Sequence, residues 1–244
     1  MPRVIKHPEI RRAEILDAAF RIFLEGGYDN TSLNEVIARA GLSKGMFYHH
    51  FASKEALLEE LFQRVTEQTY KAFEPILTDR SVDPKTQLQN VLDRGAEIRL
   101  THAELTRSAS ESLLRPESQL LYQRINDAWN DRIRPAIAEI IAEGVKTGVF
   151  DTSDPEGVAD LILQMVGSVK HLLDRGMSAR TARDRDAVAG DLAHRMQFHA
   201  VAIGRLLGLP DDTFSIGPTD FAQRFLEALN PVGLRKRRKS PVQS

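Results

Sequence analysis

The chain contains no cysteine among its 244 residues. This absence excludes disulfide bonds, thiolate nucleophiles and cysteine-ligated zinc sites. Long apolar runs are also missing, because no stretch approaches the roughly 18 consecutive apolar residues that a membrane-spanning helix needs. The opening residues, MPRVIKHPEIRR, are too polar for a secretory signal. We therefore expect a soluble, cytoplasmic protein that does not enter a membrane.

Motifs of the large enzyme classes are scarce as well. The chain contains no G-x-G-x-x-G, P-loop or H-E-x-x-H motif, and we expect no G-x-S-x-G nucleophile elbow. An enzyme, such as a hydrolase within a helical bundle, stays as an alternative that no motif favours. The sequence predicts a protein that is not an enzyme and that holds no cofactor and no metal.

Charge is nearly balanced overall, with a formal net charge of -1, but it is unevenly placed. Residues 1–54 carry eight Lys or Arg against six Asp or Glu, and the stretch from Leu234 onward carries five basic residues and no acidic one. The middle of the chain is therefore acidic. Because phosphate attraction is local at physiological salt, this distribution is compatible with DNA binding at one end of the chain.

The stretch TSLNEVIARAGLSKGMFYHHFASKEAL has the pattern of two short helices joined by a tight turn. Ser32-x-x-Glu35 has the spacing of a capping box, Gly41 suits a left-handed helix end, and Ser43 suits the start of a second helix. Such a pair forms a helix-turn-helix. The polar side of the second helix carries hydrogen-bond donors, namely Lys44, Tyr48, His49 and His50. These donors favour a recognition helix that lies in a major groove.

The block IARAGLSKGMFYHHFASKEAL, which ends at Leu57, resembles the DNA-binding region of the TetR/AcrR family of bacterial transcriptional regulators nearly position for position. The resemblance extends from about Arg11 to Leu61, and the rest of the chain resembles the family only in being helical and of suitable length. It implies an all-α fold, with an N-terminal three-helix helix-turn-helix head and a C-terminal helical-bundle body for ligand binding and dimerisation. It also implies a homodimeric, ligand-responsive regulator, most often a repressor, that binds a palindromic operator in double-stranded DNA and is released by an unknown small-molecule effector.

The resemblance also implies roles for particular residues. Bases would be read by Asn34, Lys44, Gly45 and Met46. Phosphates would be contacted by Ser32, Tyr48, His49, His50 and Lys54. The chemistry agrees, because lysine can donate to guanine acceptors, asparagine can bond adenine, and methionine can lie against a thymine methyl group. Tyr48 and Lys54 are the most favoured phosphate contacts, because nothing in the local sequence requires a phenol or an ammonium there.

Helices are predicted on both sides of this pair. Pro8 suits the first position of a helix whose apolar residues follow helical spacing, at Leu16, Ala19, Phe20 and Phe23. The basic residues near its start, Arg3, Lys6, Arg11 and Arg12, either touch DNA or form a solvated helix start. Ser53 caps a longer helix, about 54–78, that joins head to body, while Phe47 and Phe51 are expected in the core.

The remaining chain reads as helices without any convincing alternation typical of strands. Expected helices lie at about 86–109, 117–147, 155–175, 185–209 and 219–229, with a polar loop at 176–184. A break at Glu74-Pro75 and the stretch around Pro84 marks the approximate domain boundary, and Pro135 either kinks its helix or divides it. The expected domains are the head at 1–57, the body at 79–230 and a basic, disordered tail at 231–244.

Two late helices are unusually apolar for peripheral positions. The stretches 155–175 and 185–209 can together form half of a four-helix dimer interface. Alternatively they close the core of a single subunit, and the family resemblance tips the balance toward a homodimer.

No pattern in the body proves a ligand pocket. Candidates that mix aromatic surface with a few polar groups are His102, Tyr122, Trp129, Arg132, Phe150 and Met165. The pairs His171 with Asp174 and Asp191 with His194 have the spacing of two ligands on one helix face, but a metal needs more ligands than either pair offers, so solvated ion pairs are favoured.

The alternative to a ligand-released repressor is a ligand-independent regulator or activator with the same head. Release of operator DNA by small molecules favours the first, and insensitivity across broad screens favours the second. The basic RKRRK segment near the C-terminus is more consistent with a solubilising tail than with a phosphate contact.

Overall fold

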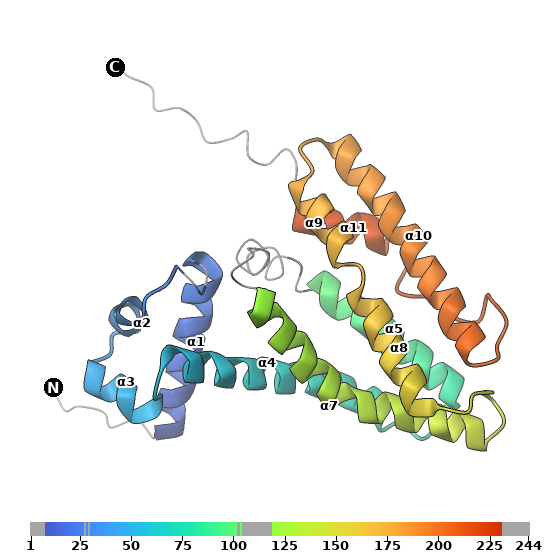
Figure 1. The fold of residues 1–244 in the computed structure, drawn as a ribbon, viewed down its shortest axis with the longest axis horizontal. Helices are drawn as coiled ribbons and strands as arrows, with labels where there is room; N and C mark the ends of the chain where they lie inside the picture. Colours follow the sequence, from blue (N-terminus) through green and yellow to red (C-terminus); the bar gives the residue numbers. More distant parts are fainter. Residues whose placement is uncertain (1–7, 27, 29, 102, 104–118, 231–244) are drawn as a thin grey trace. The chain divides into compact units, whose positions relative to one another are not determined.

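The computed structural model describes residues 8–26, 28, 30–101, 103 and 119–230, and every regular element in these ranges is an α-helix (Figure 1). The all-α fold predicted from the sequence is therefore confirmed. The described helices are α1 (Pro8–Gly26), α2 (Leu33–Arg39), α3 (Lys44–His50), α4 (Lys54–Leu77), α5 (Pro84–Thr101), α7 (Gln119–Lys146), α8 (Pro155–Gly167), α9 (Lys170–Ser178), α10 (Ala182–Leu206) and α11 (Phe221–Leu229). Each of them is too short or too polar to cross a bilayer.

The chain divides into two compact units. The head unit comprises the described residues of Met1–Ala72 and Ser108–Arg132, and the body unit comprises those of Phe73–Arg107 and Ile133–Ser244. Helices α4 and α7 therefore contribute residues to both units. The domain boundaries expected from the sequence divide the chain into consecutive segments, whereas each unit combines two separate segments. These boundaries therefore remain predictions.

The core of the head unit is formed by α1, α2, α3 and the first turns of α4. Leu16, Ala19 and Phe23 of α1 are buried, as their helical spacing predicts, and Phe20 is half-buried against the same core. Phe47 of α3 has no exposed surface. Burial of these apolar side chains supplies most of the free energy that fixes α3 in the head unit.

Helix α4 continues through Pro75 and ends at Leu77, which agrees with the helix predicted at about 54–78, so the helix itself has no break at Glu74 and Pro75. Pro75 removes only the bond that its own backbone nitrogen would donate, and the bond from the Thr78 backbone to the Glu74 carbonyl, at 3.0 Å, still forms. Phe73 and Leu77 are both buried and hold this last turn. The chain breaks instead at residues 78–83.

Helix α7 is a single helix with Pro135 inside it. The alternative of two separate helices is therefore wrong. Ile133 and Ile137 flank the proline and are each 2% exposed, and Ile140 and Ile141 are also buried. This apolar face keeps the helix in place across the missing hydrogen bond.

The helix predicted at 155–175 is divided into α8 and α9. The Ser168 hydroxyl donates to the carbonyl of Met165 at 2.8 Å, which offers the backbone an alternative to a continuing helix. No proline marks this break, so the periodicity of the apolar residues concealed it.

The polar loop predicted at 176–184 shortens to residues 179–181. Helix α10 begins early because the Thr181 hydroxyl accepts a hydrogen bond from the Asp184 backbone at 3.1 Å and donates to its carboxylate at 2.7 Å. This capping arrangement was visible in the sequence but was read as part of a loop.

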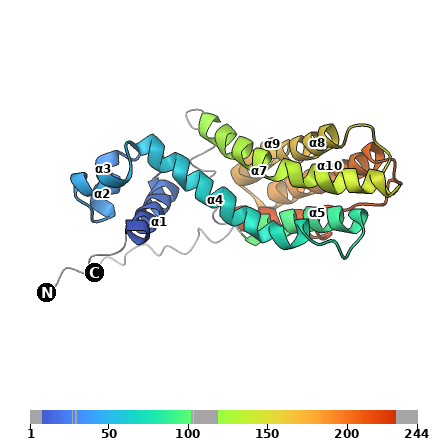
Figure 2. The same ribbon diagram turned by 90° about the horizontal axis from the view of Figure 1, so that it is seen from below.

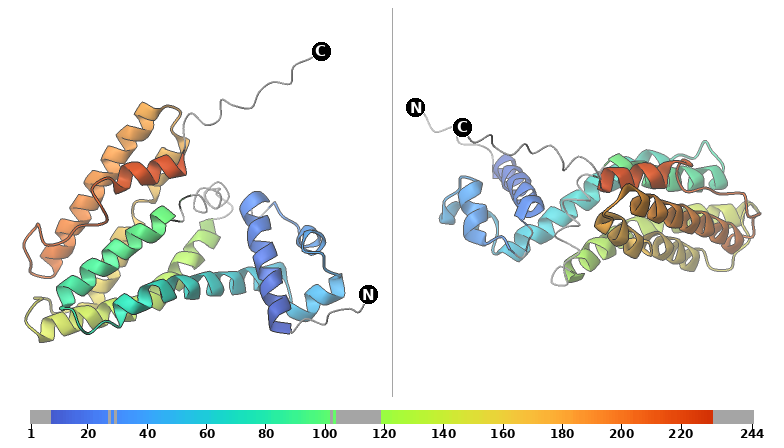
Figure 3. Two further views of the ribbon diagram at one scale, coloured as in Figure 1. Left: turned by 180° about the vertical axis from the view of Figure 1, so that it is seen from behind. Right: turned by 90° about the horizontal axis from the view of Figure 1, so that it is seen from above.

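The body unit is a helical bundle in which α5, α8 and α10 run lengthwise together (Figures 1 and 2). The short helix predicted at 219–229 is confirmed as α11, and it packs against α10, α5 and α9 (Figure 3). Its inner face is apolar throughout, with Phe221, Ala222, Phe225, Leu226 and Leu229 buried. This helix therefore belongs to the core of the body unit.

Candidate DNA-binding site

Local hydrogen bonds build the corner between α2 and α3. The Ser32 hydroxyl accepts from the Glu35 backbone at 3.1 Å at the start of α2, and the Ser43 hydroxyl accepts from the Met46 backbone at 3.2 Å at the start of α3. Gly41 has a φ of 66°, a conformation that side chains disfavour. The left-handed Gly41 and the Ser43 cap are confirmed, and Ser32 caps α2 as one half of the predicted capping box.

Helix α3 has one buried face and one exposed face. Phe47 is 0% exposed and Phe51, just after the helix, is 3% exposed, so both lie in the core as predicted. Tyr48, in contrast, is 55% exposed, although its ring edge still contacts Phe47 with centroids 5.7 Å apart. The phenol hydroxyl is thus held on a rigid base at the surface.

The predicted base readers lie at the exposed starts of α2 and α3. Asn34, Lys44 and Gly45 are exposed, and Met46 is half-buried. No neighbouring atom lies within 4 Å of where a Gly45 side chain would begin, so this surface is open. Among the predicted phosphate contacts, Ser32, Tyr48 and His49 are exposed, while His50 and Lys54 are half-buried.

Lys54 has a local function that the sequence did not reveal. Its ammonium group donates to the backbone carbonyl of Tyr28 and lies 3.8 Å from the centroid of the Tyr28 ring. The premise that nothing local requires an ammonium at this position is therefore wrong. Lys54 fastens the segment between α1 and α2 to the start of α4.

Arg12 likewise has a structural function. It pairs with Glu60 of α4, donates to the backbone carbonyl of His50 at 3.1 Å and lies 4.8 Å from the centroid of the Phe51 ring. The hydrogen bond with Glu60 raises the pKa of Arg12 above its ordinary value. Neither predicted alternative, a DNA contact or a solvated helix start, anticipates this tie between α1, the end of α3 and α4.

A second arginine ties the same helices in the opposite direction. Arg64 of α4 donates to the Ala13 carbonyl at 3.2 Å and pairs with Asp17 at 2.9 Å. Arg11 pairs with Glu14 on its own helix, and Arg3 and Lys6 lie outside the described residues.

The environment of His50 favours its neutral form. Burial lowers the pKa of this side chain, and the nearby His49, Arg12 and Arg11 lower it further, while Glu60 acts in the opposite direction. A neutral imidazole offers one donor and one acceptor and carries no charge for a phosphate.

The letters of a nucleophile elbow do occur in the chain, contrary to expectation. Residues Gly41 to Gly45 read GLSKG, which has the G-x-S-x-G spacing. An elbow places its serine between a strand and a helix, whereas Ser43 lies between two helices and uses its hydroxyl to cap α3. The match is therefore a helix cap.

The described ligand candidates are divided between the two units. Arg132 lies over the Tyr70 ring at 3.4 Å from its centroid and pairs with Glu67. Trp129 is half-buried in the head unit, whereas Phe150 and Met165 belong to the body unit. His102 and the side chain of Tyr122 lie outside the described residues.

The side chains considered for a metal form other contacts. Asp174 pairs with Lys170 at 3.2 Å, Asp191 pairs with Arg175 at 3.0 Å, and the ring of His171 contacts the Ser168 carbonyl. Within the described ranges, no three His, Asp or Glu residues come together as a metal site.

A short helix with a fully buried phenylalanine on one face and polar groups on the other, joined to its neighbour through a left-handed glycine, defines a helix-turn-helix DNA-binding protein. Residues 15–61 match the family model of bacterial regulatory proteins of the tetR family, and residues 122–188 match that of the tetracyclin repressor-like C-terminal domain. The chain belongs to the TetR family and is a transcriptional regulator that acts by binding DNA and not as an enzyme.

Individual relatives agree with this assignment. The chain is 29% identical to the HTH-type transcriptional repressor KstR2 of Mycobacterium tuberculosis over 68% of this chain and 80% of that protein. It is 35% identical to the HTH-type transcriptional regulator BetI of Burkholderia cenocepacia over 38% of this chain and 47% of that protein. A TetR-family regulator from Pectobacterium atrosepticum shares the fold with a TM-score of 0.57 at 21% identity, over 85% of this chain and all of the other.

Proposed function

We propose that this regulator is a homodimeric repressor that binds a palindromic operator and leaves it when a small molecule binds the body unit. The observation that carries the proposal is the exposed face of α3, which presents Lys44, Tyr48 and His49 outward while Phe47 is fully buried. Repression is favoured over activation because KstR2, which matches most of the chain, is named a repressor.

The contacts proposed for DNA are those that the family resemblance implies, and six of these eight residues are exposed. Bases are read by Asn34, Lys44, Gly45 and Met46. Phosphates are contacted by Ser32, Tyr48, His49 and His50. We assign Lys54 a positioning function instead, because its ammonium already serves the Tyr28 carbonyl and ring.

Dimerisation supports the palindromic operator. One short helix reads only a few base pairs, whereas a two-fold dimer reads two half-sites about 34–36 Å apart or a multiple of that spacing. Two large apolar side chains are exposed on the helices predicted to form the dimer, with Leu161 of α8 at 44% and Phe198 of α10 at 60%. Exposed apolar side chains of this size favour association with a second copy.

Release by a small molecule rests on population shift. A ligand weakens DNA binding only to the extent that it prefers the conformation that does not bind DNA. The alternative is a ligand-independent regulator or activator with the same head.

The test uses the full-length protein and the DNA that flanks its own gene. We expect Tyr48→Ala to weaken operator binding, measured by fluorescence anisotropy, about tenfold or more, because one charge-assisted phosphate contact is lost. Its melting temperature should remain close to that of the wild type, since the phenol is exposed. Equal affinity in the two proteins would refute the contact, and sedimentation of a monomer at working concentrations would refute the dimer.

A further inference from the structure

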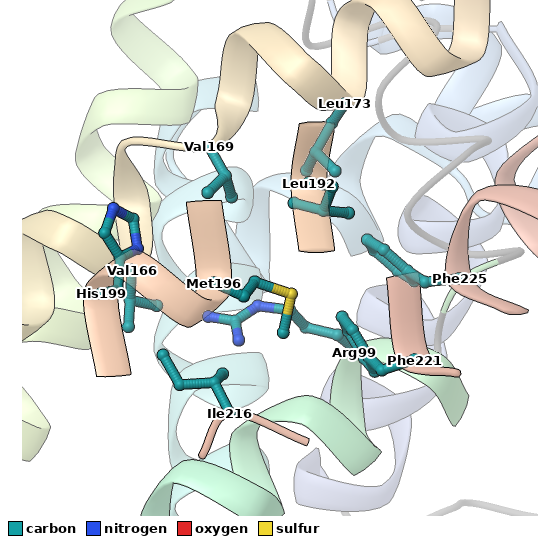
Figure 4. A pocket seen from close by; sticks show the side chains of 10 residues that line it. All are labelled: Arg99, Val166, Val169, Leu173, Leu192, Met196, His199, Ile216, Phe221 and Phe225. Atoms are coloured by element: carbon teal, nitrogen blue, oxygen red, sulfur yellow. The ribbon is translucent and has the colours of Figure 1, made fainter. Parts of the chain in front are cut away.

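A pocket in the body unit, between α5, α9, α10 and α11, is nearly filled by its own side chains (Figure 4). Figure 4 shows Arg99, Met196 and His199 around it. Its volume is about 30 Å³, enough for about one water molecule, so this conformation leaves no room for a larger ligand. A charged group that bonds directly to the DNA-binding helix lies instead in the head unit, on α1.

The end of α3 accepts a hydrogen bond from another helix. The guanidinium group of Arg12, on α1, donates to the backbone carbonyl of His50 at 3.1 Å. His50 is the last residue of α3. The last carbonyls of a helix have no partner within the helix itself, and a nearby arginine can satisfy them. Arg12 therefore caps the recognition helix from outside.

Glu60 of α4 fixes the direction of this guanidinium group. The Nε and Nη2 atoms of Arg12 donate to the two carboxylate oxygens of Glu60, so the pair is bidentate. Bidentate pairs set the plane of the guanidinium group as well as its position. The third nitrogen, Nη1, is then left to donate to the His50 carbonyl. The orientation of Arg12 thus depends on α4.

Phe51 supplies the surface on which the guanidinium group lies. The centre of that group is 4.8 Å from the centroid of the Phe51 ring, and a cation is attracted to the face of an aromatic ring. Phe51 is 3% exposed and its ring centroid is 5.7 Å from that of Phe47. Arg12 therefore rests on the same buried core that anchors α3.

We propose that Arg12 is a positioning residue for DNA recognition: together with Glu60 it fixes the end of α3, and with it the placement of Tyr48, His49 and His50, without touching DNA itself. The inference rests on the proposed function, because these three residues are the proposed phosphate contacts on α3. A good hydrogen bond spans a range of only about 0.5 Å in distance. A small displacement of α3 therefore weakens several contacts at once.

The charge of Glu60 gives the proposal a characteristic sign. A carboxylate close to DNA repels phosphates, so its removal strengthens DNA binding through electrostatics alone. If Glu60 serves to hold Arg12 against α3, its removal weakens DNA binding instead. The direction of the change in affinity thus separates positioning from repulsion.

The test measures how tightly the full-length protein binds a labelled duplex that the wild type has selected from a random pool. Affinity is followed by fluorescence anisotropy at several salt concentrations, at a temperature where each variant is folded by circular dichroism. Arg12→Gln should weaken binding about tenfold or more, because charged hydrogen bonds are lost. Its salt slope should stay that of the wild type, because no phosphate contact is removed. Glu60→Gln should weaken binding about threefold or more for the same reason.

Two variants serve as matched controls. Arg64→Gln removes the other arginine that ties α1 to α4, through the Ala13 carbonyl and Asp17, but it leaves the bond to α3 in place. This variant should lose stability and keep its affinity for DNA. Glu59→Gln removes an exposed carboxylate next to Glu60 and should leave the affinity unchanged or raise it slightly.

A lysine at position 12 separates positioning from a direct contact with DNA. Lysine binds a phosphate as a point charge, but it has no planar group that matches two carboxylate oxygens and a carbonyl together. Arg12→Lys should therefore weaken binding about threefold or more. Wild-type affinity in this variant would show that position 12 contacts a phosphate, which overturns the proposal. Because the charge is kept, the variant also gives an independent reading should Arg12→Gln fail to fold.

Hydrogen exchange of the α3 backbone gives a second measurement that needs no DNA. Exchange should be faster in Arg12→Gln than in Arg64→Gln, and equal exchange overturns the positioning function. Faster exchange with unchanged affinity would show a structural tie alone and overturns it as well, as does a salt slope that decreases by about 1.

The outcomes separate this inference from the proposed function. Loss of affinity in Arg12→Gln but not in Tyr48→Ala supports positioning and overturns the Tyr48 contact. Loss in Tyr48→Ala but not in Arg12→Gln does the reverse. Should the wild type select no duplex, the proposed function fails, while hydrogen exchange still decides whether Arg12 holds α3.

Discussion

The head and body units differ in what holds them in shape. In the head unit, short-range caps at Ser32 and Ser43 and a glycine at Gly41 set the turn, and one buried phenylalanine anchors α3. In the body unit, helices far apart in the sequence meet around α11, whose buried face is wholly apolar. The first arrangement leaves a strong local pattern in the sequence, and the second leaves almost none.

The largest loss of stability in the head unit is expected from removal of the buried Phe47 side chain. We expect Phe47→Ala to lower the free energy of unfolding by about 3–5 kcal/mol, because a fully buried aromatic side chain leaves a cavity. Thermal and urea denaturation measure this loss. Tyr48→Ala, one residue away but exposed, is the matched control, and a comparable loss in both would show that the two faces of α3 are not distinct.

The corresponding change in the body unit removes the attachment of α11. The amide of Asn230 donates to the carbonyls of Gly176, Met177 and Ala179 at 2.8–3.2 Å. Asn230→Ala should cost up to about 3 kcal/mol, because partly buried acceptors lose their donor, and should increase hydrogen exchange in α11. Gln223→Ala, which removes exposed hydrogen bonds of the same helix, should leave exchange unchanged. Equal protection of α11 in both variants would contradict this function of Asn230.

Substitution of Lys54 tests whether this basic residue of the head unit stabilises the fold or contacts DNA. Lys54→Met should cost about 2 kcal/mol of stability, because the bond to the Tyr28 carbonyl and the contact with its ring are lost. The salt dependence of operator binding should keep its slope. A slope that decreases by about 1 would instead show that a phosphate contact has been removed.

The smallest expected effect is a pH dependence from the body unit. The folded-state pKa of His199 lies below its ordinary value of 6.5, so the unfolded chain binds the proton more readily. Stability from this group is complete above pH 6.5 and is lost as the pH falls through the lower folded-state value. Denaturation between pH 5 and 7 should show a shallower decline in His199→Gln than in the wild type, and identical slopes would exclude this contribution.

Most of the head unit was predictable because its signals are local. The caps and the glycine corner involve residues within three or four positions of one another, as does the alternation between Phe47 and Tyr48. The ties made by Arg12 with Glu60 and by Lys54 with Tyr28 were not, because each joins residues more than twenty positions apart. From the sequence alone, Arg12 and Lys54 cannot be distinguished from basic residues that face DNA.

The body unit was predicted as helices but not in its packing. Its helix pattern survived with shifted ends, while the break at Ser168 was hidden by a continuous apolar stripe. The core around α11 draws together residues from Ala96 to Leu229, which are far apart in the sequence. Proximity of this kind arises only from tertiary packing, which a helical period does not encode.

The crossed arginines of the head unit have a mechanical consequence. Arg12 reaches from α1 to Glu60, Arg64 reaches from α4 back to Asp17 and the Ala13 carbonyl, and Arg12 also grips the last carbonyl of α3. A rotation of α4 about its own axis would therefore move α1 and the end of α3 as well, because these charged hydrogen bonds join the three helices. Small torsions of α4 would thus suffice to reorient α3.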